Sequence, residues 1–282
     1  MRVREALAKV TGRLLEVGVA NGSQEARWLL EAALGVDGGG LACRLGDEAP
    51  SAALSRLAEL VGRRVQGEPL QYVLGTVEFH EIELAVGPGV LIPRPETEEL
   101  VEAALGLVAG VPSPRVCDVC TGSGAIALAL AHALPSASVW ATDVSAAALS
   151  WARRNAERLG LARVRLLLGD LFAPLGEERG FDLVTANPPY VSPEEYAELE
   201  PVVRDHEPRL ALEADEGGLA LLRRVVLEAR GRLRPGGWLI TEMGDTQGDA
   251  LSAMLAEAGY ADVAVRRDLA GHERMALGRW RP

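Results

Sequence analysis

The chain has 282 residues and a formal net charge of −11, because 40 Asp and Glu residues outnumber 29 Lys and Arg residues. Hydrophobic residues make up 48% and charged residues 24%, which is typical of a folded globular protein with one large domain or two smaller ones. The net acidity argues against a protein that coats nucleic acid, since phosphate binding relies on clustered Lys and Arg.

Residues 1–75 predict a small helical domain. Apolar residues recur at helical spacing over residues 2–18, and a second helix follows the turn Asn21-Gly22-Ser23. Gly38-Gly39-Gly40 is expected to break the chain, and a further helix runs from Pro50 to about Val65. This segment carries nine basic and nine acidic side chains, so the whole net charge of −11 lies in the remainder. The difference indicates two domains.

Residues 76–95 predict a β-hairpin that links the two domains. Short strands are expected around Val77–Val86, and Gly87-Pro88-Gly89 is typical of a turn. Residues 96–282 then alternate helices with seven short apolar strands, near 115–119, 139–142, 164–168, 181–186, 238–242, 263 and 275–277. This alternation is typical of an α/β fold, in which helices cover both faces of a mostly parallel sheet.

A glycine-rich loop follows the first strand of this domain. Cys120-Thr121-Gly122-Ser123-Gly124 leads directly into a helix, and glycines at such a junction let the backbone approach a ligand closely. The next strand ends at Asp143, 19 residues after Gly124, where a carboxylate can accept both ribose hydroxyls of an adenosine. The glycine-rich loop and Asp143 together indicate a nucleoside-containing cofactor. Gly122-x-Gly124-x-x-Ala127 also satisfies the looser dinucleotide pattern.

The third and fourth strands end in two further candidate site segments. Asp170 followed by Leu171-Phe172 suits an adenine, because a carboxylate can accept the exocyclic amine while apolar side chains cover the ring. Asn187-Pro188-Pro189-Tyr190 ends the fourth strand, and two prolines cannot continue a central strand. The Asn187 amide oxygen and the Pro188 carbonyl can together accept both hydrogens of a planar –NH₂ group.

That arrangement suits methyl transfer from a sulfonium to an amide or nucleobase nitrogen. Such a nitrogen is a poor nucleophile because its lone pair is delocalised, so hydrogen-bond acceptors and close positioning both help. Tyr190 can lie against the flat face of the substrate. The reaction requires no metal, and Cys117-x-x-Cys120 lacks the second Cys pair or His cluster of a zinc site.

Taken together, these motifs resemble the S-adenosylmethionine-dependent methyltransferases with a Rossmann-like sheet, and specifically the release factor glutamine methyltransferases, also called the HemK or PrmC family. The resemblance covers nearly the whole chain. It also rests on Gln71-Tyr72-Val73-Leu74-Gly75, Ile92-Pro93-Arg94-Pro95-Glu96-Thr97-Glu98, Glu207-Pro208-Arg209, Gly217-Gly218-Leu219, Pro235-Gly236-Gly237, Glu242-x-Gly244 and Asp268-Leu269-x-Gly271. Cys120 stands where the family usually has a glycine, and Phe79-His80-Glu81 lacks the glycine that the family often carries there.

The resemblance implies N5-methylation of the glutamine in the Gly-Gly-Gln motif of bacterial peptide chain release factors, a step connected with translation termination, with S-adenosyl-L-homocysteine as the second product. It implies that residues 187–190 hold the glutamine amide and that 120–124, Asp143, Asn187 and 170–172 hold the cofactor. Arg94 and the residues up to Glu98 would close over the substrate. Residues 1–75 would dock a remote part of the release factor.

Two other interpretations of the motifs stay open. A nucleic acid amino-methyltransferase would share the Asn187–Tyr190 motif, but the basic surface that it needs is missing. An NAD-dependent oxidoreductase is favoured only by the loose glycine pattern, and it leaves Asn187–Tyr190 and Asp170 unexplained.

The sequence also bears on location and assembly. Three cysteines are too few for a disulfide framework, the start MRVREALAKV lacks an apolar signal core, and the longest apolar stretch is too short to span a bilayer. We therefore expect a cytoplasmic monomer with release factors as partners and no direct contact with nucleic acid or membrane.

Overall fold

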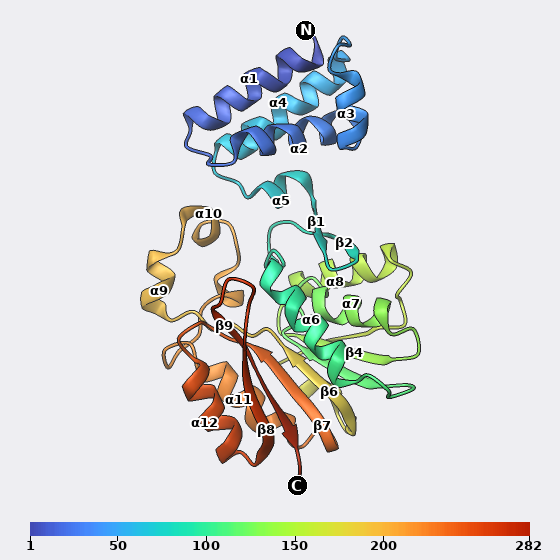
Figure 1. Ribbon diagram of the computed structural model, residues 1–282, viewed down its shortest axis with the longest axis vertical. Helices are drawn as coiled ribbons and strands as arrows, with labels where there is room; N and C mark the ends of the chain where they lie inside the picture. The colour runs from blue at the N-terminus through green and yellow to red at the C-terminus, as the bar shows by residue number, and fades with distance from the viewer. The chain divides into compact units, whose positions relative to one another are not determined.

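The computed structural model describes residues 1–282, which divide into two compact units (Figure 1). The helical unit comprises residues 1–76 together with 201–206, and the sheet unit comprises residues 77–200 together with 207–282. Each unit is built around hydrophobic clusters of its own. No helix in either unit is both long enough and apolar enough to cross a membrane.

The helical unit buries one apolar stripe from each of its longer helices. Val3, Leu14, Leu29 and Leu57 belong to its core. Its helices are α1 (Val3–Glu16), α2 (Gly22–Leu34), α3 (Gly38–Arg44), α4 (Ser51–Val65), α5 (Leu70–Leu74) and α10 (Pro201–Arg204).

The expected break at Gly38-Gly39-Gly40 is wrong, because these residues begin α3. The side chain of Asp37 accepts a hydrogen bond from the Gly40 nitrogen at 2.7 Å and so caps the helix. A cap of this kind contributes about 1 kcal/mol, which offsets the poor helix propensity of the glycines.

The seven-stranded sheet expected from the sequence is confirmed, in the strand order β5-β4-β3-β6-β7-β9-β8. Neighbouring strands from β5 to β7 pair in parallel, whereas β9 is antiparallel to both β7 and β8. The strands are β3 (Arg115–Val119), β4 (Ser138–Asp143), β5 (Arg165–Leu168), β6 (Phe181–Ala186), β7 (Leu233–Glu242), β8 (Tyr260–Arg267) and β9 (Glu273–Trp280).

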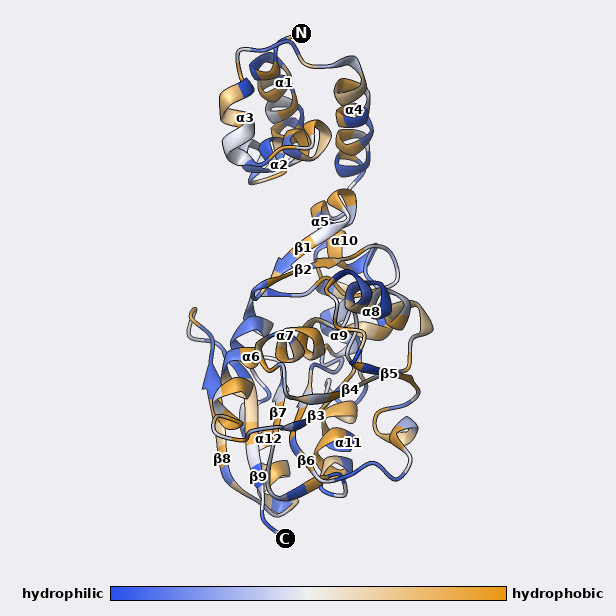
Figure 2. Cartoon of the chain, turned by 90° about the vertical axis from the view of Figure 1, so that its right-hand side faces the viewer, coloured by the Kyte–Doolittle hydropathy of each residue, from blue (hydrophilic) through white to orange (hydrophobic).

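Helices cover both faces of this sheet (Figure 2). Side chains alternate between the faces of a strand, so Val116 of β3 joins the core under one set of helices and Cys117 joins the core under the other. The first set contains α6 (Pro95–Leu107), α7 (Ala125–Ala133) and α8 (Ala146–Arg158). The second contains α11 (Ala220–Ala229) and α12 (Gly248–Glu257).

The expected hairpin is formed by β1 (Thr76–Phe79) and β2 (Ile82–Ala85), and it reverses at His80 and Glu81, ahead of the Gly87 turn. Asn155 of α8 holds its end. The Asn155 Oδ1 accepts from the Ala85 nitrogen at 2.7 Å, and its Nδ2 donates to the Ala85 and Ser123 carbonyls at 3.0 Å. This fully buried amide therefore ties the hairpin to the glycine-rich loop.

Candidate functional site

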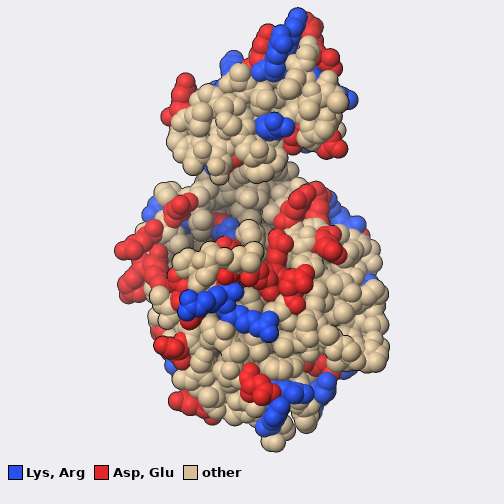
Figure 3. Space-filling view, in the orientation of Figure 1, with Lys and Arg blue, Asp and Glu red and all other residues tan.

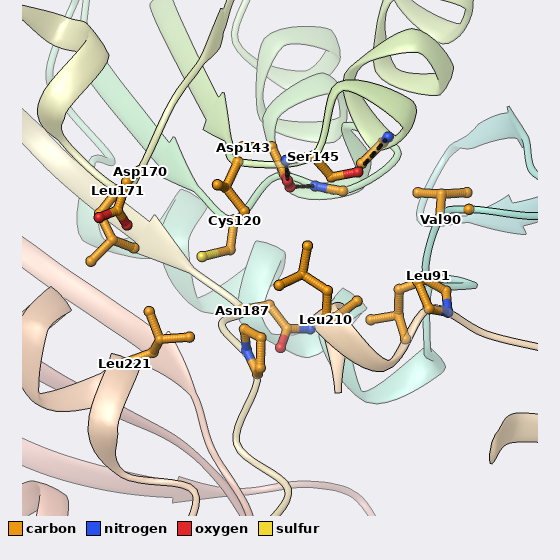
Figure 4. Close-up of a pocket in the computed structure, with 17 residues that line it drawn as sticks. Val90, Leu91, Cys120, Asp143, Ser145, Asp170, Leu171, Asn187, Leu210 and Leu221 are labelled. Carbon is orange, nitrogen blue, oxygen red and sulfur yellow. Dashed lines mark hydrogen bonds between the residues drawn. The ribbon is translucent and has the colours of Figure 1, made fainter. Parts of the chain in front are cut away.

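A pocket of about 110 Å³ lies where the parallel strands of the sheet unit end, the edge at which ligands bind in open α/β sheets. Figure 4 shows Asp143 and Ser145 on one side of it and Asn187 and Leu221 on the other. Of the residues proposed from the sequence, Cys120, Gly122, Asp143, Asp170, Leu171, Asn187 and Pro189 line the pocket. The structure thus brings together residues from four different strand ends.

The glycine-rich loop adopts backbone conformations that favour glycine. Gly122 and Gly124 have φ angles of 58° and 84°. A Cβ at Gly124 would lie 2.9 Å from Leu128 Cδ1, so the helix that follows could not pack as closely. Cys120 has a φ of 58°, so the chain keeps the left-handed path although its residue there is not a glycine. Burial raises the pKa of the Cys120 thiol, which therefore stays protonated.

Asp143 is held in place by the backbone of the loops on either side of it. Its Oδ2 accepts from the Gly122 nitrogen at 2.8 Å, and its Oδ1 accepts from the Ser145 nitrogen at 2.8 Å. Burial raises the pKa of Asp143, and these hydrogen bonds oppose that shift. Each oxygen has further acceptor capacity, so the carboxylate can also take hydroxyl donors from a ligand in the pocket.

The segment Asp170–Phe172 is divided between pocket and core. Leu171 lines the pocket, whereas Phe172 is only 1% exposed and packs within the sheet unit's core. Asp170 is half-exposed, and both of its oxygens accept from Arg224 of α11, at 3.1 and 2.8 Å. Arg224 thereby fixes the direction of the Asp170 carboxylate.

The segment Asn187–Tyr190 contributes two residues to the pocket wall. Asn187 and Pro189 line the pocket, whereas Pro188 and Tyr190 are not among its lining residues. The Tyr190 hydroxyl donates to Glu242 Oε1 at 3.0 Å, and burial next to this carboxylate raises the pKa of Tyr190.

Glu242, at the end of β7, is a site residue to which sequence reasoning assigned no role. It is 3% exposed, and its Oε2 accepts from Asn187 Nδ2 at 2.9 Å and from Thr97 Oγ1 at 2.6 Å. Burial raises the pKa of Glu242. The sequence feature that could have indicated a role for Glu242 is its place at the end of a buried central strand. An unpaired charge at such a position is costly.

Arg94 forms an ion pair with Glu207 that helps to position one wall of the pocket. Its Nη2 donates to Glu207 Oε1 at 2.5 Å, while Glu207 Oε2 accepts from the Ile92 nitrogen at 2.9 Å. Glu207 is buried, and the residues just after it, Pro208, Leu210 and Ala211, line the pocket. This ion pair therefore joins the segment before α6 to the apolar wall that contains the 3₁₀ turn η2 (Arg209–Ala211).

This chain matches known family models and curated proteins along most of its length. The PrmC N-terminal domain model matches residues 5–75, and a methyltransferase domain model matches residues 116–205. The chain is 43% identical to the release factor glutamine methyltransferase of Geobacter sulfurreducens, over 98% of this chain and 96% of that protein. It is 44% identical to the protein of the same name from Moorella thermoacetica, over 98% of both.

A solved structure shows the same fold in the sheet unit. The T. thermophilus 16S rRNA N2 G1207 methyltransferase, solved in complex with AdoMet and guanosine, matches with a TM-score of 0.54 and 20% identity. The match covers 73% of this chain and 50% of that one. At this identity it supports the fold and carries no information on the substrate.

A buried acid beneath the glycine-rich loop makes stability depend on pH. Burial raises the pKa of Asp118 to about 7 and outweighs the opposing effect of its hydrogen bonds, among them the one that Oδ1 accepts from Thr185 Oγ1 at 2.7 Å. Between about pH 4, where the unfolded carboxyl titrates, and about pH 7, the folded protein holds a proton that the unfolded chain has released. The free energy of unfolding attributable to Asp118 therefore falls as pH rises through this window.

We expect Asp118→Asn to remove this decline, so that the variant gains stability relative to the original protein between pH 4 and pH 8. The measurement is urea unfolding followed by tryptophan fluorescence across that range. Asp249→Asn removes the same charge from an exposed position and serves as the control. Parallel pH profiles for the Asp118 variant and the original protein would contradict the prediction.

Proposed function

The chain belongs to the release factor glutamine methyltransferase family, and on that premise we propose that it methylates the N5 nitrogen of the glutamine in the Gly-Gly-Gln motif of a bacterial peptide chain release factor, in the cytoplasm. The observation that carries the proposal is that Asp143 and Asn187 line the same pocket. The first is suited to hold a nucleoside, and the second to accept hydrogen bonds from an amide –NH₂ group. One cavity can therefore bring the donor and the acceptor of a methyl group together.

The pocket fits S-adenosylmethionine as the methyl donor. Asp143 would accept the ribose hydroxyls, and Asp170, directed by Arg224, would accept the adenine amine beside the apolar surface of Leu171. Gly122 leaves open space on its pocket side, since a Cβ there would have no atom closer than 4.0 Å. When bound, this cofactor supplies a methyl group on a positively charged sulfur.

The protein's own residues prepare the glutamine nitrogen. Asn187 Oδ1 and the Pro188 carbonyl would accept hydrogen bonds from the two N–H groups of the glutamine amide. These bonds would orient the amide plane and direct its nitrogen toward the methyl donor. The nitrogen would receive the methyl group that the bound cofactor supplies and would release one of its protons to water, with S-adenosyl-L-homocysteine as the second product. The two acceptors stabilise the positive charge that develops on the nitrogen. Neither step requires a nucleophilic side chain.

We also infer that residues 1–75 dock a part of the release factor remote from the glutamine. Their charges balance, whereas the sheet unit carries the whole net charge of the chain. Figure 3 shows acidic side chains gathered over α9 (Pro193–Glu198) and around α6 on this unit. Such a surface steers a basic protein substrate toward the pocket and repels nucleic acid. A nucleic acid substrate is correspondingly disfavoured.

Asn187→Ala tests the acceptor role. We expect kcat to fall by a factor of about 10² to 10³, as for loss of one preorganised hydrogen-bonding group, while the affinity for S-adenosylmethionine changes by no more than a few-fold. The measurement is mass spectrometry of a release factor after incubation with protein and cofactor, with the added methyl mapped to the glutamine. An original protein that adds no methyl there would refute the proposed function, and a fully active variant would refute the role of Asn187.

Asp143→Ala tests the cofactor site. We expect the dissociation constant for S-adenosylmethionine to rise at least tenfold, because the variant loses the carboxylate that would accept the ribose hydroxyls. Calorimetric titration measures this, with NAD titrated in parallel to examine the oxidoreductase alternative. An unchanged dissociation constant would remove Asp143 from the site, and binding of NAD alone would overturn the choice of cofactor.

Removal of residues 1–75 tests the docking role. We expect kcat/KM for a whole release factor to fall at least tenfold, and kcat/KM for a short Gly-Gly-Gln peptide to change little. Turnover of the peptide shows that the remaining sheet unit is folded and active. Equal losses on both substrates would exclude a docking function for these residues.

A further inference from the structure

The acceptor role of Asn187 depends on which end of its amide faces the pocket. A side-chain amide has an oxygen that accepts and an amino group that donates, and the two ends have nearly the same size. Only the oxygen can take a hydrogen bond from a substrate –NH₂ group. An Asn187 turned by 180° would present two donors to two donors. Something must therefore distinguish the two orientations.

Glu242 supplies that distinction. Its Oε2 lies 2.9 Å from Asn187 Nδ2, on the side of the amide opposite the free oxygen. An ionised carboxylate only accepts hydrogen bonds, so it favours the amino end of Asn187 and repels the oxygen end. The Asn187 amino group also lies 3.3 Å from Thr97 Oγ1.

Burial raises the pKa of Glu242, but the hydrogen bonds from Thr97 and Tyr190 oppose that rise, and Glu242 is the acceptor in both. Thr97 of α6 donates to Oε2 at 2.6 Å, and Tyr190 donates to Oε1 at 3.0 Å. Three donors from three different segments thus converge on one carboxylate. Thr97 uses its hydroxyl proton on Glu242, so its oxygen is available to accept from Asn187.

Glu242 has no ion-pair partner that would explain it as part of a structural salt bridge. The nearby cation that lowers its pKa is Arg274, whose Nε donates to Asp268 at 3.0 Å. Glu96 on α6 acts in the opposite direction. A buried carboxylate of this kind costs free energy that a neutral residue of the same shape would not. This cost in stability has a reason if the negative charge of Glu242 has a role at the site.

We propose that Glu242 is a positioning residue that fixes the Asn187 amide with its oxygen toward the substrate glutamine. The inference rests on the proposed function. The negative charge behind the amide also polarises it, so that Asn187 Oδ1 becomes a stronger acceptor as positive charge develops on the attacked nitrogen. Thr97 and Tyr190 keep the carboxylate in the direction that this requires.

Glu242→Gln is the direct test, because it keeps the shape and removes the charge. A glutamine can present its own amino group to Asn187, so the Asn187 amide is free to turn. We expect kcat on a release factor to fall by about 10- to 100-fold, with KM and the dissociation constant for S-adenosylmethionine within about threefold of the original values. The melting temperature is expected to be unchanged or raised, since a buried charge is removed.

A double-mutant cycle separates positioning from a general effect on the fold. If Glu242 acts through Asn187, adding Glu242→Gln to Asn187→Ala lowers kcat no further than Asn187→Ala alone. If the two act independently, their effects multiply, and the proposal is overturned. Asp182→Asn neutralises another mostly buried acid, at the opposite end of β6, and should leave kcat unchanged.

Glu242→Asp provides a second route if the glutamine variant does not fold. It keeps the charge and withdraws it by one methylene, so kcat should again fall, and this loss should also vanish in the Asn187→Ala background. A folded Glu242→Gln variant with the original kcat would overturn the proposal while leaving the proposed function intact. Failure of the original protein to methylate a release factor would instead remove the premise.

Discussion

The register of four parallel strands is the constraint on which the site depends. Thr142, Val119, Ala186 and Thr241 are aligned as Cα partners across β4, β3, β6 and β7. The residues that follow these four in the chain are, in the same order, Asp143, Cys120, Asn187 and Glu242. Parallel strands lie about 4.8 Å apart, so one row of the sheet spaces the outer two of these positions by about 14 Å. A shift of one residue in any strand would remove its side chain from the row.

Three of the four residues in this row could be predicted from the sequence, because each belongs to a local sequence pattern. Glycines at a strand–helix junction, an acid at the end of the next strand and prolines that terminate a central strand each have a local physical cause. Cys120, Asp143 and Asn187 could therefore be proposed from the order of residues alone. The seven strands followed for the same reason, because apolar runs bounded by turns are a local signal.

Other contributors to the site depend on contacts between distant segments. Thr97 lies 145 positions before Glu242, and no local pattern indicates that their side chains meet. The same holds for the apolar wall that follows Glu207, whose position depends on its ion pair with Arg94. Phe172 was expected to cover a ligand, but it lies in the core, because alternation along the chain does not say where a loop turns inward. The glycines that begin α3 were misjudged because a cap from Asp37 outweighs their propensity.

Asn155 gives the sheet unit a property that follows from cooperativity. One buried amide bonds the end of β2 and the glycine-rich loop at once, so local opening of either segment leaves part of the buried Asn155 amide unpaired, and this cost couples the two segments. The two segments should then open together, as one unit with one free energy of opening. A ligand that binds the glycine-rich loop would lower the population of the open state by mass action. It would therefore also reduce local opening of the hairpin. Occupancy of the pocket would in this way stabilise the hairpin that follows the helical unit in the chain.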